Sequence, residues 1–411
     1  MSKESRTNIK GPIWNILGGG MYAANSVLLL MLVSRRFGVE ASGEFSIAFT
    51  VSQTLWIIGV FGASHMMMTD YRQEYRFSTY LGLKILSTSA MLPMAVAICL
   101  ILGFDSEKFT LTLLLTLYMA AHAFSELFQS RMFQSNRLDL AGKSQFFRTV
   151  FSLVLFTAAI YIFESNIVAC AVLALSNLAA IYYFSYRPCR TFILTEQKPG
   201  REQLAKLTKA CLPVFVSILT MNLLMQMPKF VIEFLGNNEM QGLFGMIFMP
   251  AYAINLLSNF AYQPMLKNLG EYIYSKDRQN LLLLFSRLVI VTLAAAFLCS
   301  LLTWMIGAPV LSWLYGVELF DYRWDLTVVV LGGGIYALCQ LMYFVFVLMR
   351  RQKDIMFSYI ISLIVSVPVS IYFISILGLY GAIISFVITH GFLLMVFSAC
   401  FYQKLRRMKN V

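Results

Sequence analysis

Apolar runs of about 20 residues recur along this chain, and they limit the folds open to it more than any other feature. An α-helix needs about 20 residues to cross the roughly 30 Å hydrocarbon core of a bilayer. The runs lack the period-two alternation of apolar and polar residues that the strands of a membrane β-barrel require. Backbone groups in lipid must also satisfy one another, as they do within a helix. The sequence therefore predicts an all-α, polytopic membrane protein.

Composition favours the same fold class. The 411 residues are 59% hydrophobic and 13% charged, whereas about 25% of the residues in a soluble domain are charged. We predict about twelve membrane spans, at residues 13–34, 43–64, 79–102, 109–130, 146–163, 166–186, 211–235, 242–263, 285–307, 326–349, 355–377 and 379–402. An even number of spans places both termini on the same side of the membrane.

The basic residues between the apolar runs and near their ends fall mostly on one side of the predicted membrane. Cytoplasmic connections collect Lys and Arg, so this bias orients the chain. The richer side has Lys3, Arg6, Lys10, Arg72, Arg76, Lys84, Arg131, Arg137, Lys143, Arg148, Arg187, Arg190, Lys198, Arg201, Lys206, Lys209, Lys267, Lys276, Arg278, Arg287, Arg350, Arg351, Lys353, Lys404, Arg406, Arg407 and Lys409. The other side has Arg35, Arg36, Lys108 and Arg323. We therefore predict cytoplasmic termini, and we attribute the net charge of +12 to topology and not to nucleic-acid binding.

The longest connection divides the predicted spans six and six. It covers residues 187–210, is basic and contains the pair Pro199 and Gly200. We predict an N-terminal six-helix bundle at 1–186, a cytoplasmic basic linker at 187–210 and a C-terminal six-helix bundle at 211–411. The first span of each half ends in a glycine-spaced turn and begins on the cytoplasmic side, which indicates two parallel repeats.

Two stretches carry a family resemblance. Residues 15–49 read NILGGGMYAANSVLLLMLVSRRFGVEASGEFSIAF, and residues 211–248 begin the second half with Pro213 followed by the pattern LGxxxxxG. The segment ProMetLeu at 264–266 follows in the second half. Together with the six-plus-six spans and the basic linker, this pattern resembles the MOP exporter superfamily. Within that superfamily it is most similar to the Wzx-type flippases of lipid-linked O-antigen units, over essentially the full length.

The resemblance implies both a fold and a function. The fold would be MATE-like, with two six-helix bundles forming a V around a cavity that opens alternately to either side. The substrate would be undecaprenyl pyrophosphate bearing a short oligosaccharide, moved across the bacterial inner membrane during O-antigen or related polysaccharide synthesis. Other polysaccharide-assembly membrane proteins would be partners. Family members often have an acidic residue in the seventh span, where this chain has Lys229 and Glu233.

One basic residue stands out because it lies inside an apolar span, at Lys229 in 211–235. We find no other predicted span with a Lys or Arg so far from its ends. An isolated charge there costs about 2.5 to 3.5 kcal/mol on insertion scales, so it normally faces a cavity or a partner. We predict that Lys229 binds the pyrophosphate or an acidic sugar as a point charge. A structural pair with Glu233, one turn on, or snorkelling to the outer surface stays open.

Uncharged polar residues extend this prediction. Asn222 and Gln226 are one turn apart, and Lys229 follows three residues later, so all three can project to one side of the helix. Amides of this kind bind sugars, although they also join helices to one another. We predict substrate binding by this stripe and by Asn25 in the first span.

Two further pairs are candidates for the transport cycle. Arg35 and Arg36 stand at the outer end of the first span, where they could line the cavity mouth or complement the helix dipole. His122 and Glu126 are four residues apart and share a helical face, so they could relay a proton, as could Glu233. An interfacial network near Arg131 is the structural alternative for His122 and Glu126.

Enzymatic function is not expected. The seven cysteines show no CxxC spacing, and the three histidines form no metal-ligand or nucleophilic pattern, so we predict no metal, no cofactor and no catalysis. A polysaccharide polymerase or glycosyltransferase would need a sizeable outer loop, and the predicted outer connections are short. A cation-coupled drug exporter of the same superfamily stays an alternative, although it would want an acidic residue in the core of a span.

Two other features have a structural interpretation beside a functional one. Residues 264–280 place Leu266, Leu269 and Tyr272 at helical spacing among charges, which fits either a short surface amphipathic helix or the solvated ends of two spans. The triple glycines at Gly18–Gly20 and Gly332–Gly334 allow close helix approach or bending, and neither has the spacing of a phosphate loop.

Overall fold

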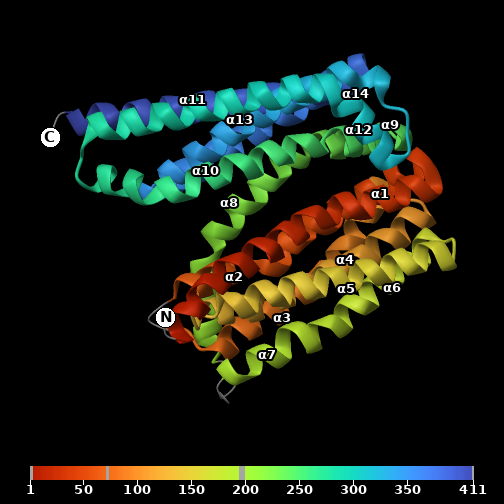
Figure 1. The fold of residues 1–411 in the computed structure, drawn as a ribbon, viewed down its shortest axis with the longest axis horizontal. Helices are drawn as coiled ribbons and strands as arrows, with labels where there is room; N and C mark the ends of the chain where they lie inside the picture. Colours follow the sequence, from red (N-terminus) through yellow and green to blue (C-terminus); the bar gives the residue numbers. More distant parts are fainter. Residues whose placement is uncertain (1–2, 71–73, 194–199, 410–411) are drawn as a thin grey trace. The chain divides into compact units, whose positions relative to one another are not determined.

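The computed structural model describes residues 3–70, 74–193 and 200–409. Within these ranges every regular element is a helix, which confirms the all-α prediction. The chain folds into two compact units, Met1–Leu219 and Thr220–Val411. Figure 1 draws the first unit from red to green and the second from green to blue. The division falls within α8 (Arg201–Phe234).

The N-terminal unit is organised around α1 (Lys3–Val60), which packs along α5, α4 and α3 (Figure 1). Its other elements are α2 (Ala63–Thr69), α3 (Phe77–Leu102), α4 (Ser106–Gln134), α5 (Leu138–Ile162), α6 (Asn166–Ala180), the π-helix η1 (Ile181–Tyr186), α7 (Arg187–Cys189) and the 3-10 helix η2 (Arg190–Phe192). The caps follow local sequence rules, since the Asp105 side chain accepts from the Lys108 amide at the start of α4. Ser165 caps α6 in the same way through the Val168 amide.

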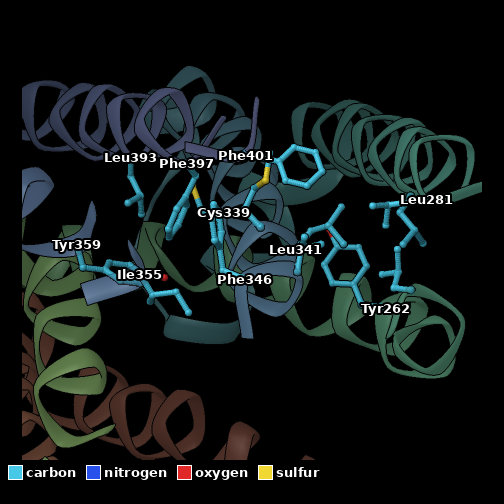
Figure 2. Close-up of a cluster of buried hydrophobic side chains, with 14 of the residues drawn as sticks. Tyr262, Leu281, Cys339, Leu341, Phe346, Ile355, Tyr359, Leu393, Phe397 and Phe401 are labelled. Atoms are coloured by element: carbon cyan, nitrogen blue, oxygen red, sulfur yellow. The ribbon is translucent and has the colours of Figure 1, made fainter. Parts of the chain in front are cut away.

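The C-terminal unit packs its helices around α13, which contacts α10, α11 and α14. Its elements after α8 are α9 (Asn238–Ile247), α10 (Met249–Tyr274), α11 (Arg278–Leu302), the π-helix η3 (Thr303–Gly307), α12 (Ala308–Tyr315), the 3-10 helix η4 (Phe320–Tyr322), α13 (Arg323–Leu348) and α14 (Gln352–Lys409). An apolar cluster joins these helices, and Figure 2 shows Tyr262 and Tyr359 toward opposite sides of it. Close packing of these side chains joins the helices of the unit.

The described helices agree with the predicted spans. Among the described residues, nine helical segments are long and apolar enough to cross a bilayer. Two of them are each interrupted at one glycine, α1 at Gly38 (φ 85°) and α14 at Gly378 (φ 58°). A positive φ is readily adopted by glycine, so each glycine lets two spans follow one another with almost no loop. With these breaks, and with α10 in the place of the span predicted at 242–263, the predicted spans are matched one for one.

Two connections can be compared with their predictions. In the linker predicted at 187–210, residues 187–192 are helical, residues 194–199 lie outside the described residues, and α8 already begins at Arg201. In the segment 264–280, α10 runs on to Tyr274 and α11 begins at Arg278. This second segment therefore consists of the ends of two long helices, and the described residues there form no separate amphipathic helix.

Close helix contacts explain part of each triple glycine. A Cβ on Gly18 would lie 2.5 Å from the Gly142 carbonyl oxygen, so α1 and α5 approach backbone to backbone. Gly19 and Gly20 face open space. In α13, a Cβ on Gly333 would lie 3.0 Å from the Ala251 backbone, and a Cβ on Gly332 or Gly334 would lie 2.9 Å from α14 or 2.5 Å from α11. The prediction of close helix approach is confirmed at these positions.

The structure corrects the statement that Lys229 alone lies far from the ends of a span. Lys84 lies inside α3 with 0% of its surface exposed, and Arg148 lies near the middle of α5 with 1% exposed. Both had been assigned to cytoplasmic connections. The reason for Arg148 is that α5 begins at Leu138 and not at residue 146, so the helix extends well before its most apolar part.

Candidate functional site

Arg148 is the centre of a buried polar network in the N-terminal unit. Its Nη1 donates to Asn177 Oδ1 of α6 at 2.7 Å. Its Nη2 lies 2.5 Å from His122 Nδ1 of α4, an acceptor when that ring nitrogen is unprotonated. The planar guanidinium thus joins α5 to two neighbouring helices at fixed angles, as a buried arginine does best. The third guanidinium nitrogen, Nε, has no hydrogen-bond partner within the described residues.

The network continues to α1 through tyrosine and asparagine side chains. Asn177 Nδ2 donates to the Tyr118 carbonyl oxygen at 3.1 Å, and Asn25 Nδ2 donates to the Tyr118 hydroxyl at 3.1 Å. The Tyr22 ring stacks on the His122 ring with their centroids 4.4 Å apart. The structure therefore brings together Asn25 and His122, two predicted site residues from different spans.

Lys84 and Glu126 add two charges beside this network. The Lys84 ammonium has no hydrogen-bond partner within the described part of the chain. It lies close enough to Glu126 and to His122 to interact with each electrostatically, and Glu126 also interacts with Arg148. We call Tyr22, Asn25, Lys84, Tyr118, His122, Glu126, Arg148 and Asn177 the basic cluster.

The predicted stripe on α8 is in the C-terminal unit. Gln226, Lys229 and Glu233 are buried, and Asn222 is half-buried. The Gln226 side chain forms a hydrogen bond with the Tyr252 hydroxyl of α10. Because α8 is helical throughout these residues, their spacing places Asn222, Gln226 and Lys229 on one side of it, and the role of each stays a prediction, as does that of Glu233.

Further polar groups lie near Gln226 in the same unit. Tyr252 interacts electrostatically with Tyr336 of α13, and the Tyr336 hydroxyl accepts from Gln340 Nε2 at 3.4 Å. The His390 ring of α14 meets the Tyr336 ring edge to face, with 5.3 Å between centroids. We call Gln226, Tyr252, Tyr336, Gln340, Tyr359 and His390 the tyrosine cluster, since Tyr359 also interacts with Tyr336.

The predicted pair Arg35 and Arg36 is not part of the basic cluster. Arg35 and Arg36 are exposed on α1, immediately before the break at Gly38. The Arg36 guanidinium forms an ion pair with Glu164 in the α5–α6 turn. Exposed ion pairs of this kind contribute about 0 to 1 kcal/mol. The ion pair between Arg36 and Glu164 therefore adds little to the stability of the turn. A role of Arg35 and Arg36 at a cavity mouth stays a prediction.

Sequence reasoning missed several members of the two clusters. The burial of Lys84 and Arg148 was not predicted, because charged residues near the end of an apolar run are counted as loop charges. Tyr22, Tyr118 and Asn177 carry no signal of their own, because each is one polar residue among apolar ones. Spacing along one helix could show that Asn222 and Gln226 share a face, but it could not show which residues on other helices they meet.

Comparisons with known proteins show the fold. No family model and no curated protein matches the sequence. Solved structures do match. One is an inward-facing conformation of a multidrug resistance MATE family transporter of the MOP superfamily, with a TM-score of 0.72, 15% identity and coverage of 97% of this chain and 96% of that one. A MATE in complex with MaL6 gives a TM-score of 0.64, 16% identity and coverage of 98% and 96%.

A third match is a MOP superfamily transporter from Pyrococcus furiosus, for which a reverse polarity of the binding pocket suggests a different function. Its TM-score is 0.61, with 15% identity and coverage of 98% and 96%. At these identities the likeness shows the fold alone. The chain has the fold of these transporters and is a multi-pass, all-α membrane protein.

Proposed function

We propose that this protein is a flippase that moves undecaprenyl pyrophosphate bearing an oligosaccharide across the bacterial inner membrane by alternating access. The observation that carries the proposal is the sign of the buried charge. Among the described residues, the buried cations are Lys84, Lys108, Arg131, Arg148 and Lys229. Among the same described residues, Glu233 is the one buried carboxylate. Buried cations in such excess attract an anion, because low dielectric strengthens their field.

The basic cluster has the chemistry to hold a pyrophosphate. Phosphate oxygens accept several hydrogen bonds, and charge-assisted bonds from guanidinium and ammonium groups are the strongest ones available in proteins. Arg148 Nε and Lys84 Nζ are buried donors that no described acceptor satisfies. A headgroup that reached them would gain these bonds, while the prenyl chain stayed in lipid. We also keep Asn222, Gln226 and Lys229 of α8 as proposed substrate-binding residues.

Orientation and energy coupling are part of the same proposal. We propose cytoplasmic termini, as the positive-inside bias indicates. Reporter fusions at Ser275, in the turn between α10 and α11, should then report cytoplasm, and fusions at Asn237 should report the exterior. The reverse result at either position would contradict the topology.

We keep His122 and Glu126 as proposed proton-coupling groups, with Glu233 as their counterpart in the C-terminal unit.

Drug export coupled to a cation is the second candidate. It is favoured by the multidrug transporter among the matched structures. The partly buried Glu126 beside Lys84 and Arg148 would be its acidic coupling group. The Pyrococcus furiosus protein favours the flippase instead, since a reverse polarity of its binding pocket suggests a different function for a transporter of this superfamily.

Reconstitution separates the two functions. The purified protein is placed in liposomes with undecaprenyl pyrophosphate oligosaccharide, and a membrane-impermeant glycosidase reports the fraction exposed outside. A flippase makes the lipid fully accessible within minutes, whereas protein-free liposomes protect about half of it. Accumulation of ethidium in cells measures drug export in parallel. Unchanged lipid protection together with lowered ethidium would replace the proposal with the drug exporter.

A matched pair of variants links transport to the buried charge. Arg148→Gln removes the buried guanidinium, and Arg137→Gln removes the guanidinium next to the start of the same helix, where it pairs with Asp139 in a partly exposed position. Transport should be lost in the first variant and kept in the second. Equal transport by both variants would remove Arg148 from the substrate site.

A further inference from the structure

One side of α5 faces away from the other helices of the N-terminal unit. Its exposed residues Phe147, Phe151, Val154, Ala158 and Tyr161 recur at intervals of three or four, so they form a single stripe along the helix. Phe147 and Phe151 are 42% and 40% exposed. Because the side chains that a membrane-spanning helix exposes meet lipid, this stripe is a lipid-facing surface, and its part nearest the start of α5 is aromatic.

Neighbouring rings hold Phe147 in place. Its ring centroid lies 5.7 Å from that of Trp14 of α1, 5.4 Å from that of Phe146 and 6.2 Å from that of Phe184 of η1. Phe184 also meets Phe151, at 6.1 Å. We call these five residues the aromatic face. Side chains that are already fixed by packing lose little freedom when a ligand binds, so the aromatic face is preorganised for binding.

Positive charge lies at one end of the aromatic face. The Lys143 ammonium lies over the Trp14 ring, 5.4 Å from its centroid. Arg187 follows Phe184 by three residues, about one helical turn, and its side chain is exposed. Two cations thus stand near the ends of the helices that carry the exposed rings, and an anionic group there would meet both positive charge and an apolar surface.

A carboxylate on the same helix does not cancel this charge. Asp139 lies one turn before Lys143 and interacts with it electrostatically. Its two oxygens accept hydrogen bonds from Arg137 Nε at 2.9 Å and from Arg137 Nη2 at 3.0 Å. Asp139 therefore has a guanidinium of its own, and the charge of Lys143 remains in excess.

The start of α3 shows how the same unit meets lipid elsewhere. α3 begins at the same end of the unit as α5, since Gln134 near the end of α4 donates to the Asp70 carbonyl oxygen at 2.7 Å. There α3 exposes the aliphatic side chains of Ile85 and Leu86, while Lys84 beside them is buried. General contact with lipid therefore requires neither rings nor an accessible cation. Interfacial anchoring uses Trp and Tyr, whereas the two exposed rings on α5 are phenylalanines.

We propose that the aromatic face, with Lys143 and Arg187, is a binding site for an anionic phospholipid, whose phosphate lies beside the two cations and whose acyl chain lies along Phe147 and Phe151. Phosphate oxygens accept charge-assisted hydrogen bonds from ammonium and guanidinium groups. The site lies at the end of the unit that we propose to be cytoplasmic, where basic groups attract anionic headgroups. It is contained in the N-terminal unit and is separate from the buried basic cluster.

Native mass spectrometry of the full chain in detergent tests the site, because the mass of a retained lipid identifies it. Phosphatidylglycerol and phosphatidylcholine with the same acyl chains are added in equal, low amounts, so that the tightest site fills first. The wild-type protein should retain mainly phosphatidylglycerol. Lys143→Met should lower phosphatidylglycerol binding about tenfold, for the loss of one charge-assisted contact, and leave phosphatidylcholine binding unchanged. Phe147→Leu combined with Phe151→Leu should weaken the binding of both lipids.

Matched variants away from the site are the controls. Lys209→Met removes an exposed lysine from the same unit, and Phe297→Leu removes an exposed phenylalanine from α11. Both should bind lipid as the wild type does, and thermal unfolding in detergent should show that every variant is folded.

Three results would overturn the proposal. Equal retention of the two phospholipids by the wild-type protein would remove the anionic selectivity. Unchanged phosphatidylglycerol binding by Lys143→Met would remove the assigned contact. Retention of undecaprenyl phosphate in place of phosphatidylglycerol, when all three lipids are offered together, would make the transported kind of lipid the occupant instead of a phospholipid.

Discussion

In the N-terminal unit, Arg148 is the bulkiest fully buried side chain among the described residues, whereas the tyrosine cluster of the C-terminal unit is built from phenols and amides. Burying a charge is costly unless partners surround it, and Arg148 accordingly bonds two neighbouring helices. Phenols and amides cost less to bury but act only over hydrogen-bond distance. The difference teaches that a buried charge is held by side chains of neighbouring helices in the N-terminal unit, whereas the tyrosine cluster of the C-terminal unit buries uncharged polar groups.

The largest expected effect tests the cost of buried charge in the two units. Arg148→Leu strands the acceptors of Asn177 and His122 and should destabilise the protein by about 3 to 5 kcal/mol, as broken buried polar networks do. Tyr336→Phe should cost about 1 kcal/mol, because it removes one hydroxyl from a neutral pair. Denaturant unfolding in detergent measures both. Similar losses would break the comparison between the units.

A second test compares how closely helices pack within the N-terminal unit and within the C-terminal unit. A Cβ on Gly142 would lie 2.3 Å from the Trp14 backbone, which cannot move aside. Gly142→Ala should therefore destabilise the protein by about 1 to 3 kcal/mol. Gly333→Ala, with contacts at 3.0 Å in the C-terminal unit, should cost less. Gly20→Ala is the control because it meets open space. Equal melting temperatures for all three would show that neither contact is tight.

A third test separates charge from packing within the basic cluster. Lys84→Met removes an ammonium that has no described hydrogen-bond partner, so no acceptor is stranded. The melting temperature should change little, while transport of the pyrophosphate lipid should fall about tenfold for the loss of one charge-assisted bond. Lys267→Met removes an exposed lysine and serves as the control. A large drop in melting temperature with normal transport would make Lys84 a structural residue.

The smallest expected effect comes from removing an exposed charge, for comparison with the buried charges above. Hydrogen bonds from the Asn280 backbone and side chain hold the pKa of Asp277 below its ordinary value, at the start of α11. Because the pKa is lower in the folded state, this stabilisation is present above the unfolded pKa and disappears as the pH falls through the folded pKa. Asp277→Ala should lower the melting temperature slightly at pH 7 and not at pH 2. A pH-independent difference would contradict this assignment.

Prediction from sequence succeeded where one helix carries the information. The apolar runs gave the spans, and the spacing of Asn222, Gln226 and Lys229 gave their shared side of α8. It failed for Lys84 and Arg148, because both lie near the start of a predicted span and were counted with the cytoplasmic charges. A lysine or arginine in the first turn or two of a span has the same local signature whether it meets water or the interior of a bundle.

The sequence by itself determined that this protein is an all-helical membrane protein, since lipid leaves the backbone few alternatives. It also predicted that spans end near Gly38 and Gly378, where the structure has a positive φ that glycine readily adopts. Only the tertiary structure decided that Arg148 meets His122 and Asn177, and that Gln226 meets Tyr252. These contacts join residues on different helices, and their distances depend on packing that no single helix encodes.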